Sequence, residues 1–227
     1  MEKVKNKDLI IKYMEKYNIR DIFTENIEED MELILFKRNE YICRDGEEIE
    51  YLLFFVEGRA KVYITLANGK SLLLCFYYPF MILGDIEFIN PNTATTNTQV
   101  VEDTYCLALP IEKARNKLIH DWKFLNYISK SLAVKLERAS KNGSINLLYP
   151  LENRLASYIS ATMESRENVF VFSENLTTLS ELLGTSYRHL HRTLNTMVDK
   201  KILKRSQYGY TVTDKEKLLS LSEEIYK

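Results

Sequence analysis

The side chains best suited to chemistry gather in residues 179–198, whose sequence is LSELLGTSYRHLHRTLNTMV. Gly184 can end a short helix, and Ser186 can cap a second helix of about thirteen residues. The second helix would place its apolar side chains on one face: Leu190, Leu194 and Met197. The other face would hold arginine, histidine and asparagine, which donate hydrogen bonds to base edges and phosphates. Two helices joined by a three-residue turn are typical of a helix-turn-helix that enters the major groove of DNA.

Positive charge is concentrated around the same segment. The whole chain has a net charge of −1, whereas residues 184–206 hold six basic residues against Asp199 alone. Residues 202–214 alternate around Tyr208-Gly209 and predict a two-stranded wing after the second helix. The alternative is that the cationic helix face is only a solvated surface. The expected DNA-binding residues are Thr185, Ser186, Tyr187, Arg188, His191, Arg192, Lys204 and Arg205.

Catalytic and metal-binding patterns are missing from the sequence. The chain has no GxSxG, HExxH or P-loop motif. His189 and His191 stand two residues apart, so on a helix they point about 200° apart and cannot chelate one ion. Cys43, Cys75 and Cys106 form no CxxC pair, which favours buried, reduced thiols. We therefore expect no enzyme, no cofactor and no metal site.

The composition is that of a globular protein. The 227 residues suffice for about two domains, and 45% are hydrophobic while 28% are charged. Residues 1–20 are charged throughout and lack the apolar core of a secretory signal. The longest apolar run, residues 72–83, contains Pro79 and is too short to span a membrane. We expect a cytoplasmic protein without a membrane partner.

Residues 30–110 have the pattern of an all-β domain. Short runs rich in β-branched and aromatic residues are separated by turn signals such as DGEE and ANGK. Glycines recur between the runs, at Gly46, Gly58, Gly69 and Gly84. This regular spacing of short strands and glycine-containing turns predicts a small barrel or jelly roll.

The helical period begins after Pro110. Residues 111–120 predict a short helix, and Asp121 then opens a longer helix that should end at Asn142, before Gly143. This helix carries a narrow apolar seam: Leu125, Ile128, Leu132, Leu136 and Ala139. The seam could pack on the β domain of its own chain or on the same helix of a second chain. Its narrowness favours the second alternative, a homodimer.

The C-terminal part predicts further helices and one strand. Residues 150–165 should form a helix, and residues 169–172 a short strand. Asn175 is the preferred cap of a helix over residues 176–183, and a capping box starting at Thr178 is the competing start. The expected domains are therefore 1–120, 121–145 and 146–227.

This order of elements resembles the Crp/Fnr family of bacterial transcription regulators over about residues 30–213. Residues 45–74, DGEEIEYLLFFVEGRAKVYITLANGKSLLL, are similar to the family's Gly-Glu…Tyr-Tyr…Gly-x-Val-Lys-Val strands. Residues 179–203 are similar to its Leu-Ala-x-Leu-Leu-Gly-x-Ser-Arg-Glu-Thr-Val-x-Arg-x-Leu recognition segment. The second similarity is the more specific.

The resemblance implies an α+β fold with an N-terminal β-roll (jelly roll) sensor domain, a long dimerisation helix and a C-terminal winged helix-turn-helix domain. It also implies a homodimer that reads a palindromic operator in double-stranded DNA, with RNA polymerase as a further partner. The alternative is a ligand-binding or protein-interaction module of the cyclic-nucleotide-binding-like class without specific DNA readout.

In this resemblance Ser186 matches the serine that starts the recognition helix, and Arg192 matches the arginine that contacts guanine in many members. Tyr187 and Arg188 stand where the family usually has Arg-Glu. A glutamate there accepts from a cytosine amino group, whereas Arg188 can only donate. We therefore expect an operator that differs from the family's common half-site.

The family's cyclic AMP cassette is altered in this chain. It begins Gly84-Asp85, and no Lys, Arg or His occurs between Ser71 and Glu112, so the usual counter-charge for the cyclic phosphate is absent. Cyclic AMP is therefore not expected as an effector, unless Arg59 or Lys61 replaces that cation. A possible small-molecule effector would be uncharged, and the candidate pocket residues are Gly84, Asp85, Thr95 and Thr96. The alternative is that residues 92–99 form a solvated loop.

Overall fold

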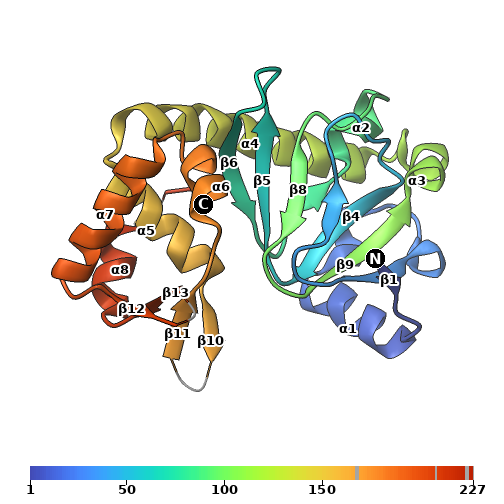
Figure 1. Ribbon diagram of the computed structural model, residues 1–227. Helices are drawn as coiled ribbons and strands as arrows, with labels where there is room; N and C mark the ends of the chain where they lie inside the picture. The colour runs from blue at the N-terminus through green and yellow to red at the C-terminus, as the bar shows by residue number, and fades with distance from the viewer. Residues whose placement is uncertain (167–168, 208, 223–224, 227) are drawn as a thin grey trace. The chain divides into compact units, whose positions relative to one another are not determined.

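The computed structural model describes residues 1–166, 169–207, 209–222 and 225–226 (Figure 1). Its contacts divide it into two compact units, Met1–Val62 with Tyr77–Arg138, and Tyr63–Phe76 with Ala139–Lys227. These units are defined by contacts alone. The expected domains 1–120, 121–145 and 146–227 stay a prediction.

The N-terminal half of the chain builds two antiparallel sheets, as the strand pattern predicts. The first sheet has the order β1-β2-β9-β4-β7 and the second has the order β3-β8-β5-β6. The strand bounds are β1 Glu2–Lys3, β2 Glu32–Phe36, β3 Tyr41–Cys43, β4 Tyr51–Glu57, β5 Ala60–Thr65, β6 Ser71–Tyr77, β7 Ile82–Leu83, β8 Asn97–Val100 and β9 Thr104–Pro110. The expectation that residues 92–99 form a solvated loop is wrong at its end, because Asn97 and Thr98 are buried in β8.

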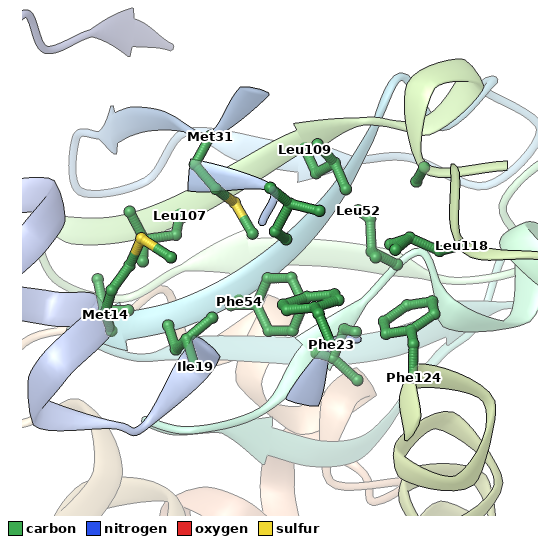
Figure 2. Packing of buried hydrophobic residues seen from close by; sticks show 14 of the residues in the cluster. Met14, Ile19, Phe23, Met31, Leu52, Phe54, Leu107, Leu109, Leu118 and Phe124 are labelled. Atoms are coloured by element: carbon green, nitrogen blue, oxygen red, sulfur yellow. The ribbon is translucent and has the colours of Figure 1, made fainter. Parts of the chain in front are cut away.

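Helices cover the first sheet (Figure 1). They are α1 Lys7–Lys16, the 3₁₀ turns Ile19–Ile22 and Glu28–Asp30, α2 Asp85–Ile89 and α3 Ile111–Leu118. Aromatic side chains fill the space beneath them. Phe23 stacks on Phe124 with 5.3 Å between ring centroids and meets Phe54 edge-on at 6.2 Å (Figure 2). Each buried aromatic side chain stabilises the fold by about 1.5 to 3 kcal/mol, so this cluster anchors the first turn of the next helix.

That next helix, α4, spans Trp122–Leu148. Its predicted start is confirmed, because Asp121 Oδ1 accepts hydrogen bonds from the amides of Lys123 and Phe124 at 3.0 and 3.2 Å. Its predicted end at Asn142 is wrong. Gly143 keeps a helical backbone, since the buried Asn142 donates its side-chain amide to the Leu74 carbonyl at 2.7 Å and holds this turn.

The seam predicted on α4 divides between two environments. Ile128 is 1% exposed and belongs to the core of its own chain, where Leu125 and Leu132 also pack partly. Leu136 is 74% exposed, and Ala139 is exposed as well. Packing on the β domain of its own chain therefore accounts for Ile128, and only part of the predicted seam is left on the surface of the single chain.

The part of the chain that follows α4 contains the predicted helices and wing. Its elements are α5 Leu151–Thr162, β10 Glu164–Arg166, β11 Val169–Phe172, α6 Leu176–Leu182, α7 Tyr187–Asp199, β12 Leu203–Ser206, β13 Gly209–Val212 and α8 Lys215–Leu221. The strands form one sheet in the order β10-β11-β13-β12. The expectation that the helix over 150–165 includes Glu164 is wrong. Glu164 pairs with Val171 across an antiparallel ladder, and this pairing overrides helix propensity.

Candidate nucleic-acid interface

The second helix of the helix-turn-helix, α7, begins as its sequence predicts. Ser186 has an extended backbone, and its hydroxyl accepts a hydrogen bond from the His189 amide at 3.2 Å. Gly184, at φ +57°, ends the preceding turn in the left-handed region, where a side chain would be strained. Asn175 caps α6 through its side-chain oxygen, so the preferred start of that helix is also confirmed.

Burial fixes the rotation of α7 about its own axis. Three apolar side chains are fully buried: Leu190, Leu194 and Met197. Tyr187, Arg188 and Arg192 are exposed, and His191 and Asn195 are half-buried. Turning the helix would expose the three apolar groups at about 1.5 to 3 kcal/mol each. The polar face predicted from the sequence therefore points outward.

A row of contacts through Tyr187, His191, Asn195 and Arg205 links this face to the wing. The rings of Tyr187 and His191 stack with 6.3 Å between centroids and a 19° interplanar angle. His191 Nδ1 lies 3.4 Å from Asn195 Nδ2, and Arg205 Nη2 donates to Asn195 Oδ1 at 2.6 Å. The sequence pattern does not predict the last bond, because Arg205 belongs to a different element. The sequence indicates only that Tyr187, His191 and Asn195 lie side by side on the helix, because they are spaced four residues apart.

The wing is a short antiparallel ladder. Lys204 lies opposite Thr211 and Arg205 opposite Tyr210, so the two basic side chains leave the strand on opposite faces. Both are exposed. Tyr208, part of the predicted turn, lies outside the described residues. Gly209 has φ +116°, and a Cβ there would lie 2.6 Å from the Phe172 carbonyl oxygen.

The basic patch is weaker than the sequence count suggests. Lys200 Nζ forms an ion pair with Glu152 of α5 at 2.8 Å. Glu152 lies outside residues 184–206, and its carboxylate offsets one of the six positive charges of that segment. The remaining positive side chains include Arg188 and Arg192 on α7 and Lys204 and Arg205 on β12.

Asp85, which follows Gly84 at the start of the altered cyclic AMP cassette, forms an ion pair in the structure. Asp85 is 1% exposed, and its Oδ1 lies 2.6 Å from the Lys135 ammonium. Ser131 donates to the other carboxylate oxygen at 3.3 Å, and Lys135 also donates to the Ile82 carbonyl at 2.9 Å. Burial alone lowers the pKa of Lys135, but Tyr77 and Asp85 outweigh it and raise this pKa above the usual value.

Lys135 is a residue that the sequence pattern did not identify as part of the pocket, because it comes from α4, fifty residues after Asp85. Of the two replacement cations expected from the roll, Arg59 already pairs with both oxygens of Glu102 at 2.7 Å, and Lys61 is 7% exposed. Gly84, at φ +91°, has no room for a side chain, because a Cβ would lie 2.7 Å from the Tyr51 carbonyl oxygen. Of the other candidates, Thr95 is exposed and Thr96 is half-buried.

The cysteines are buried free thiols, as predicted, and burial raises the pKa of Cys43 and of Cys106. Among the residues that the structure describes, no three His, Cys, Asp or Glu side chains gather in a metal-binding group. In the same part of the chain, no helix combines the length and apolar character needed to cross a membrane.

Known proteins resemble the chain along most of its length. A cyclic nucleotide-binding domain model matches residues 33–121, and a Crp-like helix-turn-helix domain model matches residues 153–221. The regulatory protein YeiL of Escherichia coli O157:H7 is 32% identical over 212 residues, which cover 93% of this chain and 95% of YeiL.

Solved structures share the fold. A Crp/Fnr-family putative transcriptional regulator from Eubacterium rectale aligns with a TM-score of 0.72 at 17% identity, over 86% of this chain and 91% of that one. A CRP-family transcriptional regulator from Thermus thermophilus, TTHB099, aligns with a TM-score of 0.67 at 15% identity, over 86% of this chain and 98% of that one.

Proposed function

Because the chain belongs to the Crp/Fnr family of transcriptional regulators, we propose that it acts as a homodimer that reads a palindromic operator with α7. The observation that carries this proposal is the orientation of α7. Its apolar face is buried and its arginines face outward beside a basic wing, which is the arrangement that a major-groove reader needs.

The exposed residues take different roles in this proposal. Arg188 and Arg192 donate to guanine edges, since guanidinium matches the O6 and N7 acceptors. Tyr187 and His191 contact a base edge or a phosphate. The backbone amides near Thr185 and Ser186 face a phosphate at the helix start, and Lys204 and Arg205 contact phosphates from the wing.

The surface of α4 supports the homodimer. Three exposed apolar side chains lie along one stripe of the helix, Trp122, Leu136 and Leu147, which are 66%, 74% and 86% exposed; Val134 and Leu148 are exposed outside this stripe. The positions between them are small or uncharged: Ser129, Ala133, Ser140 and Gly143. Spacings of three, four and seven keep these residues on one side, so the same stripe of a second chain can pack against it. A two-fold axis along this seam places two α7 helices on an inverted repeat.

The buried Asp85–Lys135 pair supports the expectation that cyclic AMP is not the effector. The ribose of cyclic AMP would have to compete with the Lys135 ammonium for the Asp85 carboxylate. The phosphate of cyclic AMP would also lack the arginine of the family's cassette. Calorimetry with cyclic AMP is expected to show no saturable binding at micromolar concentration. We further propose that the protein works in the cytoplasm with RNA polymerase as a partner.

Selection of bound sequences from random double-stranded DNA tests the proposed function. The wild-type chain should enrich an inverted repeat, and the double variant Arg188→Ala/Arg192→Ala should enrich none. Arg44→Ala is the matched control, because it removes an exposed cation from the roll and should leave the selected repeat unchanged. Equal enrichment by the wild type and the double variant would remove α7 as the reading element.

A further inference from the structure

The bond from Arg205 determines which way the Asn195 amide faces. A guanidinium has five N–H donors and no acceptor, so the Asn195 atom 2.6 Å from Arg205 Nη2 must be the oxygen. The amide nitrogen therefore faces His191. Since that nitrogen can only donate, the 3.4 Å contact requires His191 Nδ1 to accept. In a neutral imidazole with an unprotonated Nδ1, the proton sits on Nε2.

We propose that Arg205 and Asn195 fix His191 in the Nε2–H tautomer and so make it a hydrogen-bond donor toward one base of each half-site. This inference rests on the proposed function of α7. The Nε2–H group matches the acceptors of the major groove, namely guanine N7 and O6, adenine N7 and thymine O4. It cannot accept from the amino groups of cytosine or adenine. Asn195 and Arg205 are positioning residues in this arrangement.

The surroundings of His191 restrict its ring as well as its proton. The ring is half-buried and stacks on Tyr187, and Nδ1 is occupied by Asn195. Nε2, the ring nitrogen farther from the backbone, is thus the one left for a base. Water competes for the Arg205–Asn195 bond in the free protein, but bound DNA would exclude that water and strengthen the row.

The first test reads the tautomer directly. Long-range ¹H–¹⁵N NMR of the three histidines distinguishes Nδ1–H from Nε2–H, and His191→Ala assigns the signal. At about pH 8 the wild type should show Nε2–H at His191. In Asn195→Asp the new carboxylate can only accept, so the proton should move to Nδ1. The same tautomer in both proteins would overturn the proposal without any reference to DNA.

The second test reads the consequence in selected DNA sequences. His191→Ala should erase the preference at one position of each half-site, which identifies the base that His191 reads. Asn195→Asp leaves Nε2 as an acceptor, so that position should change from an acceptor edge to the amino group of cytosine or adenine. A change of about tenfold in relative enrichment is expected. A tautomer that switches while the selected base stays the same would also overturn the proposal.

A matched pair of wing variants separates positioning from charge. Arg205→Ala and Lys204→Ala each remove one positive charge from β12, but only Arg205 bonds Asn195. Both should weaken binding to all sequences, and only Arg205→Ala should also relax the position read by His191. Identical selected sequences in the two variants would show that Arg205 acts through charge alone. A wild type that selects no sequence would refute the proposed function, whereas failure of these variants alone leaves it standing.

Discussion

At the scale of single residues, substitutions of Arg192 and Lys204 should impair DNA binding in different ways. Arg192→Ala removes a donor to a base edge, so it should cost about 1 to 3 kcal/mol on the operator and relax preference at one position per half-site. Lys204→Ala removes a phosphate contact, so it should weaken all sequences alike and reduce the salt slope by about one. Binding isotherms at several salt concentrations, on operator and random DNA, measure both effects. An Arg192→Ala protein with unchanged affinity and selected sequence would contradict this assignment.

The Asp85–Lys135 pair leads to a prediction about stability. Lys135→Met leaves a buried carboxylate without its cation and should destabilise the fold by about 3 to 5 kcal/mol. The double variant Asp85→Asn/Lys135→Met removes both charges and should recover much of this loss. Denaturant unfolding compares the two variants. Equal losses in both would mean that the side chains contribute through packing rather than through their charges.

The pH dependence of the same pair has a definite sign. The pKa of Lys135 is raised in the folded chain, so the stability it contributes is fully present below its unfolded value near 10.4. This contribution is lost as the pH rises through the higher folded value. Wild-type stability should therefore fall more steeply above pH 10 than that of the double variant.

Sequence periodicity predicts which face of α7 is exposed, because the 3.6-residue repeat of Leu190 and Leu194 sets it locally. It does not predict pairs such as Asp85 with Lys135, or Asn195 with Arg205, since these residues meet only when separate elements pack. The sequence pattern therefore indicates a loop without a basic residue near Asp85, whereas the cation that pairs with Asp85, Lys135, comes from α4.

At the scale of elements, Asp121 joins the start of α4 to the N-terminal segment. Its Oδ2 accepts from the amide and hydroxyl of Thr24 at 2.7 and 2.8 Å, while Oδ1 caps the helix. Burial raises the pKa of Asp121, but the hydrogen bonds from Thr24 and Phe124 outweigh it and hold this pKa below the usual value. The ionised carboxylate is thus the form that stabilises the fold.

Asp121→Ala should therefore cost about 2 to 3 kcal/mol at neutral pH. Because the folded pKa is lowered, the stability from Asp121 is present above its unfolded value near 3.9 and lost as the pH falls through the folded value. Denaturant midpoints between pH 7 and pH 2 should show the difference between wild type and variant shrinking in acid. A difference that stays constant over this range would contradict the role given to the carboxylate.

The limits of prediction also differ from element to element. The start of α4 follows from Asp121, whose cap is local. Its end does not follow from Gly143, because Asn142 and Ile145 are held by contacts with other segments and Pro150 is the effective stop. The strands β7 and β10 have only two and three residues, and β8 is polar (Asn97–Val100), so their pairing partners give them a strand structure that no pattern within them predicts.

At the scale of the whole molecule, the proposed function requires two copies of α7 held at a fixed spacing, and α4 is the element proposed to hold them. Substitution at the predicted seam must separate this role from folding of the roll. Leu132 does not separate them, because it packs partly against the core of its own chain. Leu136 does, since its side chain is 74% exposed and outside that core.

Leu136→Glu should therefore produce a folded monomer. In the dimer the two new carboxylates would face each other across an apolar seam, where a charge without a partner is costly to bury. Analytical ultracentrifugation at micromolar concentration should give a dimer for the wild type and a monomer for the variant, with unchanged thermal unfolding of the roll. Lys130→Glu, an exposed change outside the apolar stripe, is the control and should stay dimeric.

The Leu136→Glu monomer should lose affinity for a full inverted repeat but bind a single half-site as the wild-type protomer does. A wild type that sediments as a monomer would show that the exposed stripe of α4 has another role.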